Sequence, residues 1–385
     1  MTSRLPAKGS VPTVIASFII MLSLGGIYSW SIIAPELQND YHWSAVQTQL
    51  IFGILIAVFP STMIITGKLL KWLSVRLLSI LAAIFFSTGY LLSGFSGGNF
   101  YIILFGIGIL AGIGTGIGYL IALTLPVRWY PHKKGLVTGI ASAGFGLAAV
   151  ILTYIIKESL THSIDVLEIF RLIGWGYGGV LVLAAFFIQS PEAAPFAAVF
   201  NLKDALRTKH FFKLFSGIFF GTFAGLLVLG NLSSIGAEHG VDSIILMIGV
   251  SVFALANFTG RLSWGWVSDY FPAWVCITVA LLFQASGIFL LGYLTLTSVS
   301  YLLLSAMIGF GFGSNFVLFA KDTAHYFGVD HLSSIYPYVF MGYALAGIAG
   351  PLTGGYMYDS TGSFHYASYT AAVMSMLGAM IFLLG

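Results

Sequence analysis

Long runs of apolar residues, separated by short polar segments, dominate this chain. About twelve of these runs reach the roughly 20 residues that an α-helix needs to cross the hydrocarbon core of a lipid bilayer. The predicted spans are 12–34, 45–68, 76–95, 99–125, 135–156, 169–188, 211–234, 243–267, 273–293, 298–320, 334–357 and 366–385. They occupy nearly the whole chain, so the pattern predicts an all-α membrane protein with 12 transmembrane helices and little room for a soluble domain.

Composition strengthens this prediction. The chain is 58% hydrophobic and 8% charged, whereas roughly a quarter of the residues in a soluble domain are charged. The first apolar run follows Arg4 and Lys8, but it extends past the length of a signal-peptide core and has no convincing cleavage site, so we interpret it as the first membrane helix.

The basic residues predict the orientation of the helices. An even number of spans places both termini on one side of the membrane. If that side is the cytoplasm, all but three of the 16 Lys and Arg residues lie inside, with Lys157 and Arg171 outside and Arg261 within a helix. The positive-inside rule therefore predicts a multi-pass protein of the cell (inner) membrane with both termini cytoplasmic. Because the basic residues are spread over short loops and form no single basic face, no nucleic-acid partner is expected.

The chain divides into two similar halves. The loop after the second helix reads TGKLLKWLSV and the loop after the eighth reads GWVSDYF, and aligning Gly67 with Gly265 gives an offset of about half the chain. Two pseudo-symmetric six-helix bundles suit alternating access, since similar halves can rock about a site held between them. The predicted domains are an N-terminal bundle, a cytoplasmic linker in the longest polar interruption and a C-terminal bundle, at 1–189, 190–209 and 210–385.

Five segments carry a resemblance to a known family: GGIYSWSIIAPEL, RWYPHKKGLVTGIASAGFGLA, NFTGRLSWGWVSD, GFGFGSNFVLF and YFGVDHLSSIYPYVFMGYALAG. At these segments the chain resembles the major facilitator superfamily, and within it the branch of oxalate/formate antiporters and monocarboxylate transporters, bacterial lactate transporters above all. The resemblance covers almost the whole chain. It implies the major facilitator fold and secondary transport of a small organic solute.

Arg261 is the only Lys or Arg predicted inside the hydrocarbon region, where insertion of an arginine costs roughly 2.5 to 3.5 kcal/mol. Its side chain either snorkels to the cytoplasmic headgroups or faces the interior of the bundle. A position one helical turn deeper than Gly265 favours the interior. A planar guanidinium can hold a carboxylate through two parallel hydrogen bonds, and in the resembling family the arginine at this position binds the substrate carboxylate. Arg261 is therefore the predicted anion-binding residue.

Further candidates for the substrate site come from helices that line the cavity in the resembling superfamily. Buried phenols and amides need hydrogen-bond partners, which a substrate could supply. Ordinary packing and helix-to-helix hydrogen bonding remain open alternatives for each of them. The candidates are Tyr28, Tyr119, Asn257, Asn315, Phe316, Tyr336, Tyr338 and Tyr343.

Two departures from the resembling family bear on specificity and coupling. Asn257 stands where animal monocarboxylate transporters have an aspartate, and Tyr343 stands where oxalate exchangers have the lysine that holds a second carboxylate. One cation neutralises a dianion poorly, so a monoanion is the expected substrate. No acidic residue is predicted deep inside a span, and a relay of buried carboxylates is therefore not visible. Symport of the anion with a proton and exchange of one anion for another both stay open, and the resemblance to lactate carriers favours symport.

The resemblance also implies a gating residue. Asp269 in GWVSDYF matches an acidic residue that takes part in a cytoplasmic gate contact in the family, whereas Lys71 replaces its counterpart in the first half.

Other classes of function find little support. The lone cysteine, Cys276, allows no disulfide framework, no ligand spacing for a metal is present, and no cofactor is predicted. A membrane-embedded enzyme would need a catalytic group that the sequence does not offer, and a transport-like sensor usually carries a further signalling domain. We therefore predict a non-enzymatic, monomeric carrier of small monocarboxylates such as L-lactate and pyruvate, with an anion exchanger or a carrier of another small organic solute as alternatives.

Overall fold

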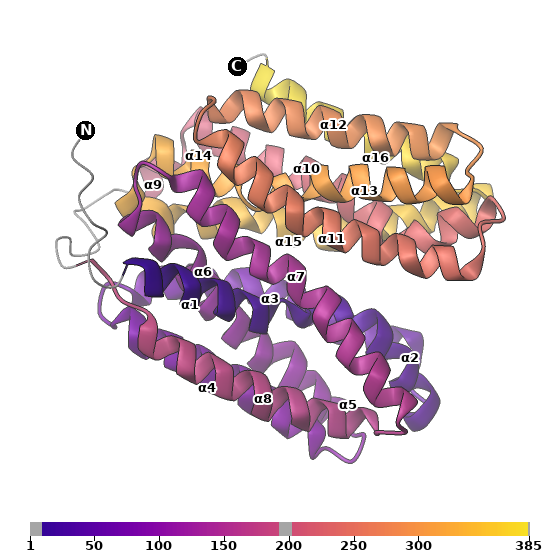
Figure 1. The fold of residues 1–385 in the computed structure, drawn as a ribbon, viewed down its shortest axis with the longest axis horizontal. Helices are drawn as coiled ribbons and strands as arrows, with labels where there is room; N and C mark the ends of the chain where they lie inside the picture. The colour runs from indigo at the N-terminus through magenta and orange to yellow at the C-terminus, as the bar shows by residue number, and fades with distance from the viewer. Residues whose placement is uncertain (1–9, 192–201, 384–385) are drawn as a thin grey trace. The chain divides into compact units, whose positions relative to one another are not determined.

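The computed structural model describes residues 10–191 and 202–383, and every regular element in these ranges is helical (Figure 1). The elements of the first half are α1 (Ser10–Leu24), η1 (Gly25–Ser29), α2 (Trp30–Tyr41), α3 (Ala45–Leu69), α4 (Val75–Gly94), α5 (Phe100–Ile103), η2 (Leu104–Ala111), α6 (Gly112–Trp129), α7 (Lys134–Thr161) and α8 (Val166–Phe187). Those of the second half are α9 (Leu202–Leu206), α10 (Lys209–Glu238), α11 (Ser243–Ser268), α12 (Ala273–Tyr293), α13 (Ser298–Ser314), α14 (Leu318–Tyr326), η3 (Val329–His331), α15 (Leu332–Thr361) and α16 (His365–Leu383).

The predicted architecture is confirmed. Twelve helical segments of the described chain are long and apolar enough to cross a membrane. Arg4 and Lys8, together with residues 192–201 of the predicted linker, lie outside the described residues.

Three of the predicted spans are interrupted. The 3₁₀ turn η1 separates α1 from α2, and η2 is a π-helical stretch between α5 and α6. The tenth span, predicted as one helix over 298–320, consists of α13 and α14 joined by a turn at residues 315–317. At this turn the Asn315 side-chain amide donates to the Phe312 carbonyl oxygen at 3.0 Å, which satisfies an acceptor at the end of α13.

The chain forms two compact units. Unit 1 comprises the described residues of 1–132, 140–200 and 329–337, and unit 2 comprises those of 133–139, 201–328 and 338–385. Each unit thus includes one short segment from the other half of the sequence. The linker predicted at 190–209 stays a prediction.

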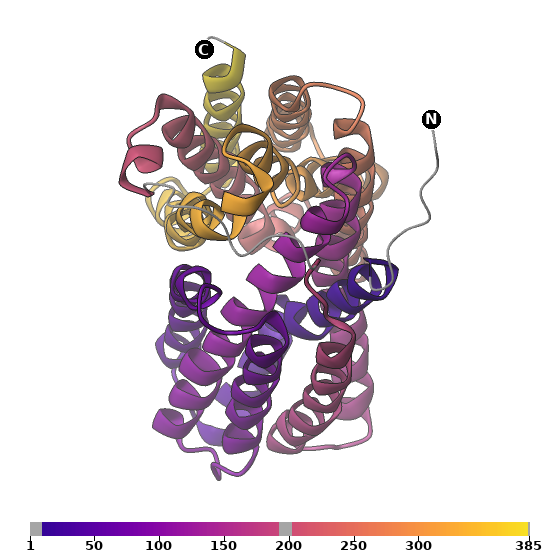
Figure 2. The same ribbon diagram turned by 90° about the vertical axis from the view of Figure 1, so that its left-hand side faces the viewer.

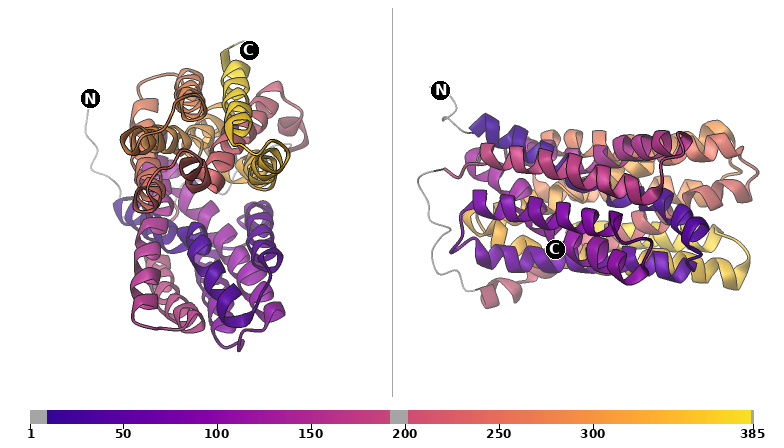
Figure 3. Two further views of the ribbon diagram at one scale, coloured as in Figure 1. Left: turned by 90° about the vertical axis from the view of Figure 1, so that its right-hand side faces the viewer. Right: turned by 90° about the horizontal axis from the view of Figure 1, so that it is seen from below.

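Small residues allow close helix packing in unit 1. Helices α4 and α8 lie side by side (Figure 1; Figure 3, right). The Ser87 hydroxyl donates to the Gly174 carbonyl oxygen at 2.8 Å, and a Cβ added at Gly178 would lie 2.5 Å from the same hydroxyl oxygen. Contacts of this kind are typical of membrane helices, because backbone approach and hydrogen bonds replace the hydrophobic effect inside lipid.

Unit 2 contains an even closer pair of helices. While α16 packs against α10 and α12 (Figure 2; Figure 3, left), α11 packs against α13. A Cβ at Gly260 would lie 2.3 Å from the Phe310 carbonyl oxygen, and one at Gly309 would lie 2.3 Å from the Phe253 carbonyl oxygen. Only glycine leaves room for the two backbones to approach this closely. This pairing places the face of α11 that carries Arg261 against α13.

Candidate functional site

Arg261 is fully buried, with 0% of its surface exposed. The snorkelling alternative therefore does not describe this side chain. Its Nε donates a hydrogen bond of 3.0 Å to Oδ1 of Asn257, one turn earlier on α11. Its Cζ lies 4.0 Å from the centre of the Phe316 ring, within the range of a cation–π interaction. Two neighbours thus fix the plane of the guanidinium.

The Phe316 ring beside this guanidinium belongs to a cluster of three aromatic rings. The Phe316 ring lies at the turn between α13 and α14 and contacts Tyr343 edge to face, with 5.5 Å between ring centres. Tyr343 is stacked on Phe340 at 4.8 Å. All three rings are buried. Away from water the effective dielectric constant is low, so a charge here interacts strongly with an anionic ligand.

Asn257 is a partner of the guanidinium itself. The sequence predicted it as a substrate ligand, and the structure shows its amide oxygen bonded to Arg261. A neutral amide can hold Nε in place without cancelling the positive charge, whereas an aspartate at this position would form an ion pair. Asn257 therefore orients the arginine while preserving its capacity to bind an anion.

The candidate tyrosines that belong to unit 1 are Tyr28, Tyr119 and Tyr336. Tyr119 is buried and packs edge to face against Phe59 and Phe145, with ring centres at 5.0 and 5.2 Å. Tyr336 is also fully buried. Tyr28 lies in η1, and its side chain lies outside the described part of the structure. Of the candidates, the contacts connect Arg261 with Asn257, Phe316 and Tyr343, all within unit 2. Tyr338 is half-buried on α15.

Asn315 connects helices in unit 2. Its Nδ2 donates to Oε1 of Gln284 at 3.3 Å, and Nε2 of Gln284 donates to the Gly221 carbonyl oxygen at 2.8 Å. Both side chains are fully buried. These bonds link α10, α12 and the turn after α13, as the helix-to-helix alternative expects. Sequence reasoning missed Gln284, although one glutamine within the apolar run TVALLFQASG was a signal that could have identified it.

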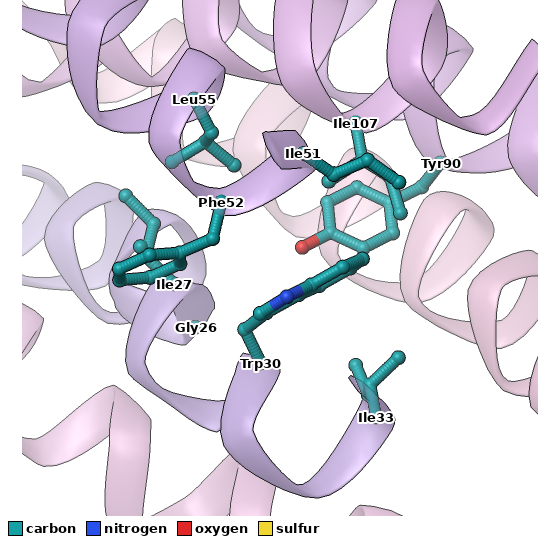
Figure 4. A pocket seen from close by; sticks show the side chains of 9 residues that line it. All are labelled: Gly26, Ile27, Trp30, Ile33, Ile51, Phe52, Leu55, Tyr90 and Ile107. Carbon is teal, nitrogen blue, oxygen red and sulfur yellow. The ribbon is translucent and has the colours of Figure 1, made fainter. Parts of the chain in front are cut away.

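A small pocket lies elsewhere in unit 1 (Figure 4). The residues that line it are Gly26, Ile27, Trp30, Ile33, Ile51, Phe52, Leu55, Tyr90 and Ile107. The lining is apolar except for the Tyr90 hydroxyl and the Trp30 indole, and the indole nitrogen donates to the Thr48 carbonyl oxygen at 3.1 Å. None of the predicted substrate residues lines this pocket, which offers no charge for an organic anion.

Asp269 holds the start of α7. Its two carboxylate oxygens accept hydrogen bonds from the backbone N–H groups of Gly135 at 2.8 Å and Leu136 at 2.9 Å. A carboxylate at this position also interacts favourably with the positive end of the helix dipole. A Cβ at Gly265 would lie 2.5 Å from the Gly135 carbonyl oxygen, so glycine is required for this approach.

The equivalent place in unit 1 uses different chemistry. Lys71 is exposed, and Arg128 forms an ion pair of 3.5 Å with Asp330 in η3. Gly67 still lies close to the start of α15, since a Cβ added there would be 2.4 Å from the Ser333 carbonyl oxygen. The close packing is thus present in both units, while the capping carboxylate is present in unit 2.

Metal-binding clusters are missing from the part of the chain that the structure describes. No three or more His, Cys, Asp or Glu side chains within residues 10–191 and 202–383 lie close enough together to hold a metal ion. Cys276 is a buried free thiol.

The chain is similar to known membrane transporters. It is 26% identical to the oxalate:formate antiporter of Oxalobacter formigenes over 87% of this chain and 82% of that protein. It is 23% identical to the human monocarboxylate transporter 11 over 94% of this chain and 79% of that protein. The resemblance to this branch that the sequence predicted is therefore confirmed.

Solved structures have the same fold. The Major Facilitator Superfamily transporter FucP, solved in the outward conformation, matches 98% of this chain and 99% of its own with a TM-score of 0.75 and 14% identity. The sequence model of the Major Facilitator Superfamily, as a protein family, matches residues 13–351. With twelve apolar helices of membrane-spanning length and a family model that matches most of its sequence, this chain is a multi-pass membrane transporter that belongs to the Major Facilitator Superfamily.

Proposed function

We propose that this transporter carries small monocarboxylates of the L-lactate and pyruvate type by alternating access. One observation carries the proposal: the fully buried guanidinium of Arg261 is oriented by Asn257 and Phe316. Such a group can bind a carboxylate through two charge-assisted hydrogen bonds. A sugar or an uncharged drug would give no reason to bury it. The names of the relatives, an oxalate:formate antiporter and a monocarboxylate transporter, support an organic anion.

The surroundings of Arg261 favour a monoanion. Tyr343 occupies the position at which the resembling oxalate exchangers have a second cation, and here it packs against Phe316 and Phe340. An aromatic wall suits the short apolar end of a lactate or pyruvate molecule better than a second carboxylate, because burying an unpaired charge is costly. The tyrosine hydroxyl could bond to the hydroxyl or keto oxygen of such a substrate.

Coupling to a proton is the first expectation, and it is tested by uptake into proteoliposomes. Radiolabelled lactate should enter several times faster when the outside is acidic than when the pH is equal on both sides. A protonophore should abolish the difference, and protein-free liposomes give the passive background. If internal lactate or formate accelerates uptake and the proton gradient has no effect, the carrier is instead an anion exchanger, the mechanism that the name of the antiporter relative favours.

The cellular arrangement is proposed on the distribution of basic residues. Placing both termini in the cytoplasm leaves Lys157 and Arg171 on the outer face, in agreement with the positive-inside rule. We place the protein in the cell (inner) membrane as a functional monomer.

The contact of Asp269 with α7 acts as a gate in this proposal. Residues 133–139 at the start of α7 belong to unit 2, and the helix continues into unit 1 beyond them. Breaking the two hydrogen bonds of Asp269 would therefore release the start of α7 from unit 2. Such a contact can be made in one state of the transport cycle and broken in another.

Replacing Asp269 by asparagine should slow lactate uptake about tenfold, because one of two charge-assisted hydrogen bonds, worth roughly 1.5 to 3 kcal/mol each, is lost together with the charge at the helix end. Initial uptake rates in proteoliposomes with equal amounts of protein measure the effect. Asp359→Asn provides the matched control, since Asp359 is exposed near the end of α15. An unchanged rate for Asp269→Asn would contradict the gate.

A further inference from the structure

His210 and Asp322 form an ion pair outside the group of residues that surrounds Arg261. Nε2 of His210, at the start of α10, lies 3.2 Å from Oδ2 of Asp322 on α14. The Asp322 side chain is 6% exposed and that of His210 is 22% exposed. The imidazole is stacked on Tyr326 with 3.8 Å between ring centres and 8° between planes. A nearly dry carboxylate thus faces a partly exposed imidazole, and the two facing atoms, Nε2 and Oδ2, are themselves buried.

Helix α14, which carries Asp322, is tied to three other elements of unit 2. The Lys321 ammonium donates to the Ser268 carbonyl oxygen at the end of α11. The Lys134 ammonium at the start of α7 donates to the Ala324 carbonyl oxygen at 3.2 Å. The ion pair with His210 adds the start of α10. The position of α14 therefore depends on contacts at the ends of these helices.

The same helix is linked to the substrate arginine. A turn at residues 315–317 separates α13 from α14, and Phe316 in this turn carries the ring that lies over Arg261. Helix α14 begins at Leu318, two residues further along. A displacement of α14 would be transmitted to the Phe316 ring through this short stretch of backbone.

We propose that His210 and Asp322 form a proton-binding site that latches α14 to α10. Histidine changes its charge near neutral pH. In acid the imidazolium attracts the carboxylate, and with little solvent around Asp322 the attraction is poorly screened. As the pH rises, His210 loses its proton. With a neutral imidazole, Lys321 remains as a cation in electrostatic range of Asp322, but the attraction that ties α14 to α10 is lost, which favours the release of α14. The latch is thus closed in acid and opens towards alkaline pH.

The neighbouring groups leave His210 as the natural carrier of this proton. Among the described residues at this end of the elements packed around the pair, the other charged or titratable groups are Lys203 and Asp204 on α9, Arg207, Lys209 and Lys213, Lys134 on α7, Lys321, His325 and Tyr326 on α14, Asp269 and Tyr270 after α11, and Cys276 on α12. Arg261 lies about two turns before the end of α11, and Glu238, His239 and His365 lie at the far end of α10. At the end of the elements that holds the pair, only His325 is a second histidine among the described residues. It is exposed on the same helix as Asp322, and this makes it the matched control.

The native cysteine can report on the latch. Cys276 is 3% exposed, on α12, which packs against α14, and its thiol lies within electrostatic range of Lys321. The rate at which N-ethylmaleimide alkylates Cys276 in the purified full-length protein should rise when α14 is released. Dividing the rate of a variant by that of the wild type at each pH removes the titration of the thiol itself.

His210→Gln keeps a hydrogen-bonding side chain but cannot become charged. Its Cys276 should react about fivefold faster than that of the wild type near pH 5.5, and equally fast near pH 8.5, as expected for an ion pair worth up to about 1 kcal/mol. Asp322→Asn should behave in the same way, and His325→Gln should follow the wild type throughout. Melting temperatures at the alkaline end, where the latch is open, show whether each variant is folded. A ratio that does not vary with pH in either variant of the pair, or an equal effect of His325→Gln, would overturn the latch.

The labelling experiment uses no substrate and therefore tests the latch independently of the proposed function. Only the consequence of the latch for transport rests on that function. If Cys276 becomes accessible as described while lactate is not transported, the latch stands and the substrate assignment fails. If lactate is transported and labelling shows no contribution from His210, the substrate assignment stands and the latch fails.

Discussion

Replacing Arg261 by lysine is expected to lower lactate uptake about a hundredfold, since two charge-assisted hydrogen bonds, worth roughly 1.5 to 3 kcal/mol each, can no longer form together. An ammonium keeps the charge but presents no planar pair of donors. It also loses the stacking over Phe316 and the bond from Nε to Asn257 that orient the guanidinium. Initial rates of lactate uptake in proteoliposomes measure the effect.

The control for this variant is the same substitution at an exposed arginine. Arg207→Lys should leave uptake unchanged, because Arg207 is exposed between α9 and α10. Stabilisation by ligand separates a binding defect from misfolding: saturating lactate should raise the melting temperature of the wild type and of Arg207→Lys, but not that of Arg261→Lys. If Arg261→Lys transports lactate at the wild-type rate, the guanidinium does not hold the substrate and the proposed function is wrong.

The twelve spans and the interior position of Arg261 could both be predicted from the sequence, and for one physical reason. Lipid provides no partners for polar groups, so long apolar runs must be helices and a charged residue within one must face protein. Asn257 was identified, but its role was not. Its spacing of four residues from Arg261 places the two side chains on one helix face, and the structure shows that this neighbour accepts the hydrogen bond of the Arg261 Nε.

Other features depend on contacts between distant parts of the chain. The turn at residues 315–317 interrupts an apolar run that looks continuous, and the bond between Asn315 and Gln284 that accompanies it joins residues far apart in sequence. Asp322 was missed because the tenth span was predicted to end at residue 320, whereas α14 continues to Tyr326 and buries this carboxylate. Helix ends are set by tertiary contacts that a local pattern does not contain.

Gly313→Ala should destabilise the protein by about 1 to 3 kcal/mol, the usual cost of forcing an extra carbon into a packed interior. The new Cβ would lie 2.5 Å from the Asn257 carbonyl oxygen and 3.0 Å from the Arg261 backbone nitrogen. Both are backbone atoms that cannot rotate away, so α11 and α13 must separate. Thermal unfolding in detergent micelles, followed by circular dichroism, should show a lower melting temperature.

For Gly355→Ala, the same chemical change at another position, we expect no loss of stability. Gly355 lies within α15, and a Cβ added there would meet nothing within 4 Å. Alanine is favoured over glycine inside a helix by up to about 1 kcal/mol, so the melting temperature should stay the same or rise. Lactate uptake should fall in Gly313→Ala, because the displaced backbone belongs to Asn257 and Arg261, and remain normal in Gly355→Ala. Equal stability of the two variants would mean that close approach of α11 and α13 is not what holds Arg261 in place.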